Sequence, residues 1–232
     1  MYSVVKNWAD QPIHFIDFEG NGVSGIIEFG VVTLQGDEIA ETRTRLCAAI
    51  GRVKAEDTAI HGLAENALRA FAPFRDEWEY FASLRESGPL AAHFAHVENY
   101  LLKTVWAYPR TSPDFARPGR VTTEWGAWID TGRLYPQFFP QLGEGKLEQL
   151  VTACGLQAEL DLLAVDHCPT GRRNYHAALY DALAGALLLQ AFLRRRECAE
   201  ATLPWLLEMS TGDGAKRYAL QEDGLYYARS LI

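Results

Sequence analysis

Three strand-like segments near the start of the chain are joined by links that are too short for parallel pairing. Residues 13–18 and 26–34 are mostly apolar, and residues 39–46 alternate in the manner of a half-exposed strand. A parallel pair needs a crossover of about a dozen residues or more, whereas the links 19–25 and 35–38 are shorter. The three segments are therefore predicted to form an antiparallel meander.

Strands and helices alternate in the rest of the pattern. A helical stretch is expected at residues 63–86, with a break near Pro73, followed by a short apolar strand at 88–94 and a helix at 95–105. A fifth strand is expected at 126–132, and two further helices are expected at 145–156 and 177–196. This order predicts an α/β fold with a mixed five-stranded sheet, in which three antiparallel strands are followed by parallel strands, flanked by helices.

The composition limits the partners of the chain. Its 232 residues are 48% hydrophobic and 22% charged, which suits one packed domain with a modest extension. A formal charge of -8 counts against tight, non-specific duplex binding, so nucleic-acid contacts should be short, local or metal-assisted. The sequence lacks an apolar signal core, a membrane-spanning apolar run and a CxxC pair, so we expect a reduced, cytoplasmic protein without membrane contact.

Two carboxylates end the first strand. Asp17 and Glu19 are two residues apart, so they project from the same face if the strand continues to Glu19. Like charges at this distance repel, and a hard divalent cation such as Mg²⁺ or Mn²⁺ neutralises them well. The alternative is a solvated strand end with two surface acids.

Two further segments carry candidate site residues. His176 and Asp181 lie about 140° apart on a regular helix. They converge only if His176 lies in the loop before the helix and Asp181 in its second turn. Glu98 lies near the start of the helix at 95–105. Each has an ordinary alternative: His176 as a helix cap or surface residue, and Glu98 as a charge that complements the helix dipole.

Three segments in order carry a family resemblance: FIDFEGNG (15–22), LAAHFAHVENYLL (90–102) and HAALYDA (176–182). They resemble the motifs of the DnaQ-like 3′-to-5′ exonucleases with a catalytic histidine (DEDDh), the group that includes the proofreading epsilon subunit of bacterial DNA polymerase III. Residues 59–68, 128–140 and 145–156 resemble supporting segments of the same family. The resemblance covers about residues 12–196.

The resemblance implies a ribonuclease-H-like fold and a hydrolase that removes nucleotides from the 3′ end of single-stranded DNA or RNA. It implies two ions, Mg²⁺ or Mn²⁺, held by Asp17, Glu19, Glu98 and Asp181, with His176 as the general base. It places the terminal nucleotide near Gly20, Asn21, Gly22, His61, Gly62 and Leu63. It does not specify DNA or RNA, nor proofreading, repair or RNA processing.

The resemblance also divides the chain. Residues 1–196 would form the exonuclease domain, and residues 197–232 a C-terminal extension, helical or hairpin, packed on it. The extension could instead bind a polymerase or another protein, or form a dimer contact. The sequence does not specify an oligomeric state.

The second motif departs from the family pattern. Glu98 stands where the family has aspartate, and Phe94 and Val97 replace the usual asparagine and phenylalanine. One alternative is therefore a catalytically weakened exonuclease fold that serves as a nucleic-acid-binding or polymerase-accessory module. Another is a transition-metal hydrolase that uses His93, His96 and Glu98.

Each of two groups of arginines can be interpreted in two ways. Arg110, Arg117 and Arg120 share a proline-rich loop with aromatic residues, which suits either a track for a single strand or a solvated loop. Arg172 and Arg173 precede His176 and suit either a phosphate contact or a surface position.

Overall fold

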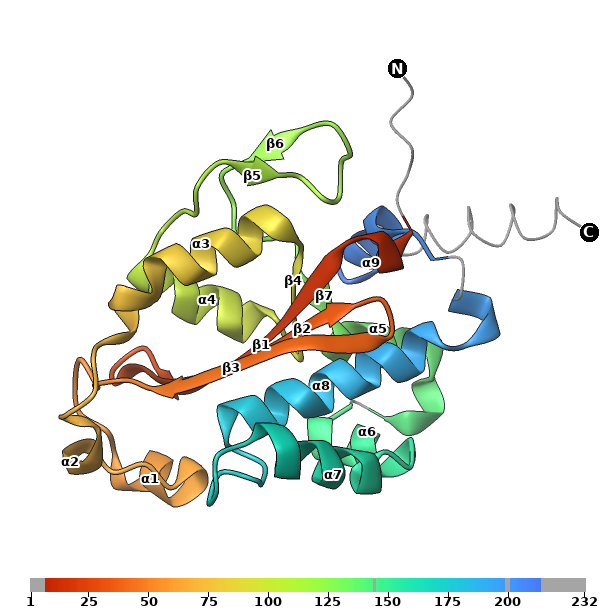
Figure 1. The fold of residues 1–232 in the computed structure, drawn as a ribbon. Helices are drawn as coiled ribbons and strands as arrows, with labels where there is room; N and C mark the ends of the chain where they lie inside the picture. The colour runs from red at the N-terminus through yellow and green to blue at the C-terminus, as the bar shows by residue number, and fades with distance from the viewer. Residues whose placement is uncertain (1–6, 144, 199–200, 214–232) are drawn as a thin grey trace, which may run out of the picture.

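The computed structural model describes residues 7–143, 145–198 and 201–213. Its five-stranded sheet has the order β3-β2-β1-β4-β7 (Figure 1). The strands are β1 Pro12–Asn21, β2 Gly25–Gln35, β3 Glu38–Leu46, β4 Leu90–Ala92 and β7 Ile129–Asp130. β1, β2 and β3 pair antiparallel, whereas β4 and β7 continue the sheet in parallel. The predicted meander and the mixed α/β sheet are confirmed.

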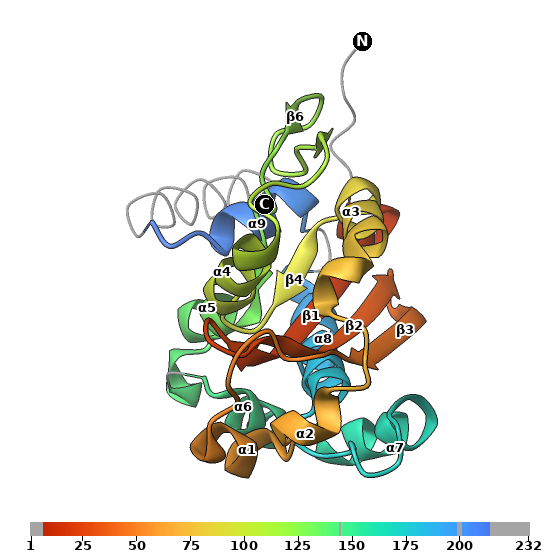
Figure 2. The same ribbon diagram turned by 90° about the vertical axis from the view of Figure 1, so that its left-hand side faces the viewer.

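Helices cover both faces of the sheet. They are α1 Ala55–His61, α2 Glu65–Leu68, α3 Trp78–Ser87, α4 His96–Val105, α5 Thr131–Phe138, α6 Leu147–Ala153, α7 Gln157–His167, α8 Ala178–Leu193 and α9 Leu203–Met209. Figure 2 shows α3 and α4 on one side of β1 and β2, and α8 with α6 and α7 on the other. Each face of the sheet has its own hydrophobic core, and the side chains of β1 alternate between them. Phe15 faces α8, and Phe18 faces α3.

The structure corrects three expected elements. The helical stretch 63–86 is divided into α2, a 3₁₀ turn Phe74–Glu77 and α3, because Pro73 lacks the N–H that a continuous helix needs. The fifth strand has only two residues, since Thr131 already begins α5. Helix α7 has no counterpart in the expected pattern because its exposed Leu162 and Val165 obscure a one-sided apolar stripe.

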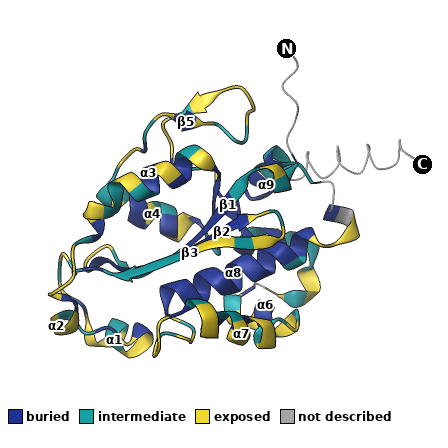
Figure 3. Ribbon diagram, viewed as in Figure 1, coloured by how far each residue is buried: buried dark blue, intermediate teal, exposed yellow. Residues whose placement is uncertain are grey.

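Glycines at two contacts allow α8 to lie close to the sheet. A Cβ built on Gly185 would lie 2.1 Å from Cε1 of Phe15, and one built on Gly30 would lie 2.3 Å from the backbone of Ala178. Figure 3 shows that α8 is buried over most of its length. These contacts place the first turn of α8 beside the end of β1 that carries Asp17.

We expect Gly185→Ala to destabilise the protein by about 1–3 kcal/mol, because the methyl group would collide with the buried Phe15 ring. Without that collision the change would be stabilising, since alanine favours helix over glycine by about 1 kcal/mol. Urea unfolding measures the sign. Phe15→Leu should recover part of the loss when combined with Gly185→Ala, and a stabilising Gly185→Ala would contradict the close packing.

Helix α9, which lies in the segment predicted to be an extension, belongs to the core of the fold. Leu203, Leu206 and Met209 of α9 join the core that contains α8. The Ser210 hydroxyl accepts a hydrogen bond from the backbone N–H of Asp130 at 2.9 Å. The hairpin or tail predicted for residues 210–232 lies outside the described residues from 214 onward. Among the described helices, none has the length and apolar character that crossing a bilayer requires.

Candidate active site

The first two acids lie at the end of β1, on the face that packs against α8. Asp17 pairs in register with Gly30 of β2, and Glu19 pairs with Glu28. The register shifts after Glu19, at a bulge where Gly20 takes φ 126°. Since β1 persists to Asn21, Asp17 and Glu19 do share one face, as the two-residue spacing predicts.

His176 and Asp181 reach these acids from the start of α8. His176 lies in the loop before the helix, with a left-handed φ of 64°, and its backbone N–H donates to Oδ2 of Asp181 at 3.0 Å. Asp181 lies in the first turn of α8, one turn earlier than expected. One ring nitrogen of His176 and carboxylate oxygens of Glu19 and Asp181 lie within 4.8 Å of one another.

Glu98 approaches from the opposite side of the sheet. It lies in the first turn of α4 and is 4% exposed. The turn before α4 places Phe94 at a left-handed φ of 61°, and the Asp130 carboxylate accepts the N–H groups of Phe94 and Ala95 at 2.9 and 3.2 Å. Asp130 therefore fixes the direction in which α4, and with it Glu98, enters the site.

The four predicted acids form one electrostatic cluster. Burial, followed by the charges of the other acids with Asp181 the largest, raises the pKa of Asp17 well above its usual value. Burial is also the main cause that raises the pKa of Glu19 and of Glu98 to about 8, and that of Asp181 to about 7. The cluster thus favours either bound protons or a bound cation.

These residues fit a divalent metal ion. Oε2 of Glu98 and Oδ1 of Asp181 are buried, and among the described residues neither has a hydrogen-bond partner. A buried carboxylate oxygen without a partner is costly. Oxygen donors from several carboxylates are the ligands that Mg²⁺ and Mn²⁺ prefer. The donor set therefore supports the predicted metal site.

The predicted nucleotide contacts in the β1–β2 connection are organised by Asn21. Its side-chain oxygen accepts the N–H groups of Val23 and Ser24 at 2.8 and 3.1 Å, and its amide donates to Asp57 of α1 at 2.9 Å. Gly20 lies against the carbonyl of Gly25, so its lack of a side chain serves the bulge itself. Gly22 faces the exposed Tyr100, whose hydroxyl would lie 2.9 Å from a Cβ on this glycine.

The predicted contacts at 61–63 follow the end of α1. His61 is buried, and its Nδ1 accepts the N–H of Leu63 at 3.1 Å. Gly62 is exposed and ends α1 with a left-handed φ of 75°. Leu63 packs with Ile27 and Leu68 in a small core. This segment adjoins the acidic site through His61, whereas the Leu63 side chain stabilises the fold.

The sequence pattern gave no role to Glu28. It lies within the apolar segment 26–34, is 2% exposed, and forms an ion pair with Arg172. A lone acid in a buried strand needs a partner, and this requirement is the sequence feature that could have identified Glu28 as important. Arg172 is therefore half-buried in an ion pair, and neither the phosphate contact nor the surface position considered from the sequence included this partner. Arg173 donates to the carbonyls of Val165 and Cys168 near the end of α7.

The structure does not support the transition-metal alternative. Both ring nitrogens of His93 have partners, the Thr131 hydroxyl at 2.9 Å and the Gly145 carbonyl at 2.7 Å. Burial lowers the pKa of His93 to about 4, so the ring is neutral. His96 is exposed, and within the described ranges the metal-binding geometry involves Glu19, His176 and Asp181 instead.

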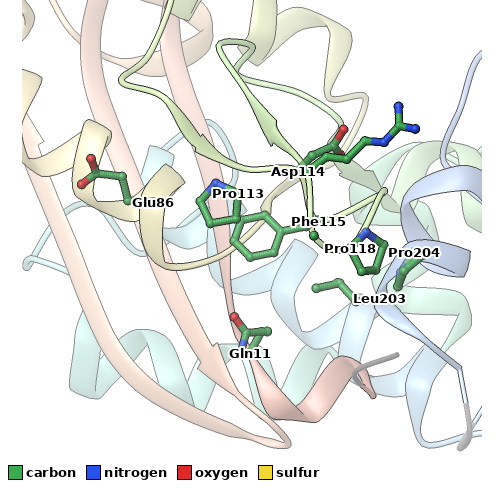
Figure 4. Close-up of a pocket in the computed structure, with 10 residues that line it drawn as sticks. Gln11, Glu86, Pro113, Asp114, Phe115, Pro118, Leu203 and Pro204 are labelled. Carbon is green, nitrogen blue, oxygen red and sulfur yellow. The ribbon is translucent and has the colours of Figure 1, made fainter. Parts of the chain in front are cut away.

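The proline-rich loop lies away from the acids. It forms the small hairpin of β5 Ser112–Pro113 and β6 Val121–Thr122, with Arg110 paired to Glu79 and Glu86 and Arg117 paired to Asp114. A cavity of about 220 Å³ separates this hairpin from α9 (Figure 4). Gln11 lines it, at the opposite end of β1 from Glu19, so the cavity is distinct from the acidic site.

Comparisons with known proteins give a consistent fold. No protein-family model and no curated protein matches the chain. Among solved structures, Exonuclease X in complex with 5′ overhanging duplex DNA is 19% identical over 84% of this chain and 99% of that one, with a TM-score of 0.62. The chain shares the fold of this exonuclease.

Two further solved structures share this exonuclease fold. The nuclease domain of 3′hExo, a DEDDh family member bound to rAMP, is 17% identical over 82% of this chain and 94% of that one, with a TM-score of 0.57. Exonuclease I of E. coli, in complex with an oligonucleotide, is 13% identical over 80% of this chain and 42% of that one, with a TM-score of 0.60. At these identities the likeness establishes the fold.

Proposed function

We propose that this protein is a metal-dependent exonuclease of the DnaQ-like (DEDDh) type that hydrolyses phosphodiester bonds at the 3′ end of single-stranded DNA or RNA. The observation that carries the proposal is the convergence of Glu19, His176 and Asp181 within 4.8 Å, on the fold shared with exonucleases, beside the half-buried Asp17 and the buried Glu98. The resemblance of the three motifs gives each of these residues its role.

The acids provide the binding site for Mg²⁺ or Mn²⁺. We assign Asp17, Glu19, Glu98 and Asp181 as the residues that hold two ions. When bound, two such ions clamp the scissile phosphate, lower the pKa of the attacking water and stabilise the leaving oxygen. Their positive charge also compensates for the net negative charge of the chain when a phosphodiester approaches.

His176 is the proposed general base. Its ring is exposed beside Glu19 and Asp181, so it can take a proton from a water that attacks a phosphate held at the acids. An imidazole suits this task because it accepts and releases protons near neutral pH. The left-handed backbone of His176 directs the ring toward the acids rather than along the helix.

Single-stranded ends suit the surroundings of the site. A cavity of about 370 Å³ beside the β1–β2 connection is lined by Val23, Arg52, Lys54, Ala55 and Glu56, and its two cations can contact phosphates. The exposed Tyr100 offers a ring on which a base can stack. The exposed Gly62 and the β1–β2 connection that Asn21 organises remain the predicted contacts of the terminal nucleotide. Binding of a polymerase through residues 197–232 also remains a prediction.

The experiment that tests the proposed function is digestion of matched DNA and RNA oligonucleotides, single-stranded and duplex, with Mg²⁺ or Mn²⁺. We expect degradation of at least one single-stranded substrate with either ion and none in EDTA. Absence of degradation of every 3′-ended oligonucleotide with both ions would refute the exonuclease and favour the nucleic-acid-binding or polymerase-accessory module.

Glu98→Asp tests whether position 98 is the acid of the second motif. We expect activity to stay within about tenfold of the wild type or to rise, because the charge is kept and aspartate is the usual family residue. Glu98→Gln has the same size without the charge and should lose about 100-fold or more. The measurement is kcat with Mg²⁺. Equal, complete loss in both variants would show that Glu98 serves a different geometry.

A further inference from the structure

An ion pair between the buried Glu28 and the half-buried Arg172 lies behind the acidic site. Nε of Arg172 donates to Oε1 of Glu28 at 3.1 Å, and Nη2 of Arg172 donates to Oε2 of Glu28. The two bonds form a bidentate pair, a geometry that fixes the guanidinium plane. Removing two charges from water is costly, and buried pairs are often no more stable than apolar replacements. The position of this pair therefore suggests a role besides stability.

The pair connects four segments around the site. Nη1 of Arg172 donates to the carbonyl of His61 at 2.5 Å, and Nη2 donates to the carbonyl of His176 at 3.0 Å. Oε2 of Glu28 also accepts the N–H of Ala178 at 3.2 Å, one of the donors that the first turn of α8 leaves without a helical partner. β2, the end of α1, the His176 loop and the start of α8 thus meet at one ion pair.

The backbone of His176 needs such support. A left-handed φ of 64° is costly for a residue with a Cβ and persists only where neighbouring contacts hold it. Here both backbone polar groups of His176 are held, the N–H by Asp181 and the carbonyl by Arg172. With its backbone held at both ends, the ring is directed to the carboxylates of Glu19 and Asp181.

We propose that the Glu28–Arg172 ion pair is a positioning element for catalysis, which holds His176 in the conformation that aims its ring at the attacking water. The inference rests on the proposed function. Arg172 and Glu28 touch neither the substrate nor the reacting atoms in this account; they act through His176. Displacing a catalytic group by about 1 Å costs about 100-fold in rate, so loss of the pair should slow the reaction without removing the acids.

The test replaces the pair by apolar residues of similar length, Glu28→Met with Arg172→Met, because removing one partner alone would bury an unpaired charge and could prevent folding. The double replacement is made in the wild type and in His176→Ala. We expect kcat to fall about 100-fold in the wild type and less than about threefold in His176→Ala, since a positioning element has no effect once its target is absent. Arg194→Met, which breaks the exposed ion pair with Asp37, is the control and should keep wild-type kcat.

Equal losses in both backgrounds would overturn the proposal, as would an unchanged kcat in the double replacement. A second measurement does not depend on activity. In protein with ¹³C-labelled histidine, the His176 ring signal, assigned by its absence in His176→Ala, should move toward the free-histidine position when the pair is replaced. If the wild type digests no oligonucleotide, the proposed function fails, and an unmoved His176 signal would separately show that the pair does not hold this residue.

Discussion

Asp17→Asn should lower kcat by at least about 1,000-fold with Mg²⁺, because it removes a charged ligand from the centre of the proposed metal site. Burial, followed by the charges of the other acids with Asp181 first, raises the pKa of Asp17 well above its usual value. The same change should raise the melting temperature in EDTA at pH 8, because it relieves repulsion within the cluster. A single-turnover assay and a thermal melt measure the two effects.

The opposite signs of these effects separate lost chemistry from lost folding. Asp37→Asn is the matched control, since Asp37 is an exposed acid on the β2–β3 turn, paired with Arg194. It should change neither kcat nor the EDTA melting temperature appreciably, because exposed ion pairs contribute about 0–1 kcal/mol. Near-normal turnover in Asp17→Asn would refute its assignment as a metal ligand.

The metal-free protein should lose stability as the pH rises from 6.5 to 8.5. The folded pKa values of Glu19 and Glu98 are about 8 and that of Asp181 is about 7, all above their ordinary values. A raised carboxyl pKa means that the folded state holds protons that the unfolded state has released. Stability is therefore full below the unfolded pKa near 4 and is lost as the pH passes the folded values.

Above pH 6.5, the loss of stability caused by these carboxyl groups can be observed without an opposing contribution from buried histidines. Below this pH, His14 and His93, whose pKa values burial lowers to about 4, contribute the opposite trend, because they take up protons on unfolding. We expect a fall in melting temperature of about 10 °C in EDTA over the pH range from 6.5 to 8.5, since 1 kcal/mol shifts a domain of this size by about 2–4 °C. Saturating Mg²⁺ should abolish most of the fall.

The measurement is a set of thermal melts at four pH values, with EDTA and with 10 mM Mg²⁺ as the chosen condition. The control is Asp17→Asn combined with Glu98→Gln, which removes two of the four titrating carboxyl groups and should flatten the EDTA curve. Parallel curves with and without Mg²⁺ would contradict the account, because they would show that the cation does not bind where the protons do.

Strand periodicity and link lengths were sufficient to predict the meander and to predict that Asp17 and Glu19 project from the same face of β1. Both depend on local rules: side chains alternate along a strand, and short links leave only antiparallel pairing. The mixed sheet followed from the order of the later elements. Helices α5 and α7 did not, because Thr131 begins a helix directly from a strand and α7 exposes apolar side chains.

The candidate site was less accessible to local reasoning. Convergence of His176 with Asp181 depends on a left-handed residue, which nothing in a regular helical pattern indicates. Glu28 was hidden in an apolar strand, and its partner Arg172 lies 144 positions away in the chain. Family resemblance supplied roles that spacing alone left open, and the structure supplied the tertiary contacts that connect them.

The most direct test of the central claim is a time course with one single-stranded oligonucleotide labelled at either end, in Mg²⁺ or Mn²⁺, with Asp17→Asn as the control. For a 3′-to-5′ exonuclease we predict a ladder of shortening products from the 5′-labelled strand, immediate release of labelled mononucleotide from the 3′-labelled strand, and neither in the variant. Progressive shortening from the 5′ end, internal cuts, or undiminished digestion by Asp17→Asn would contradict the account.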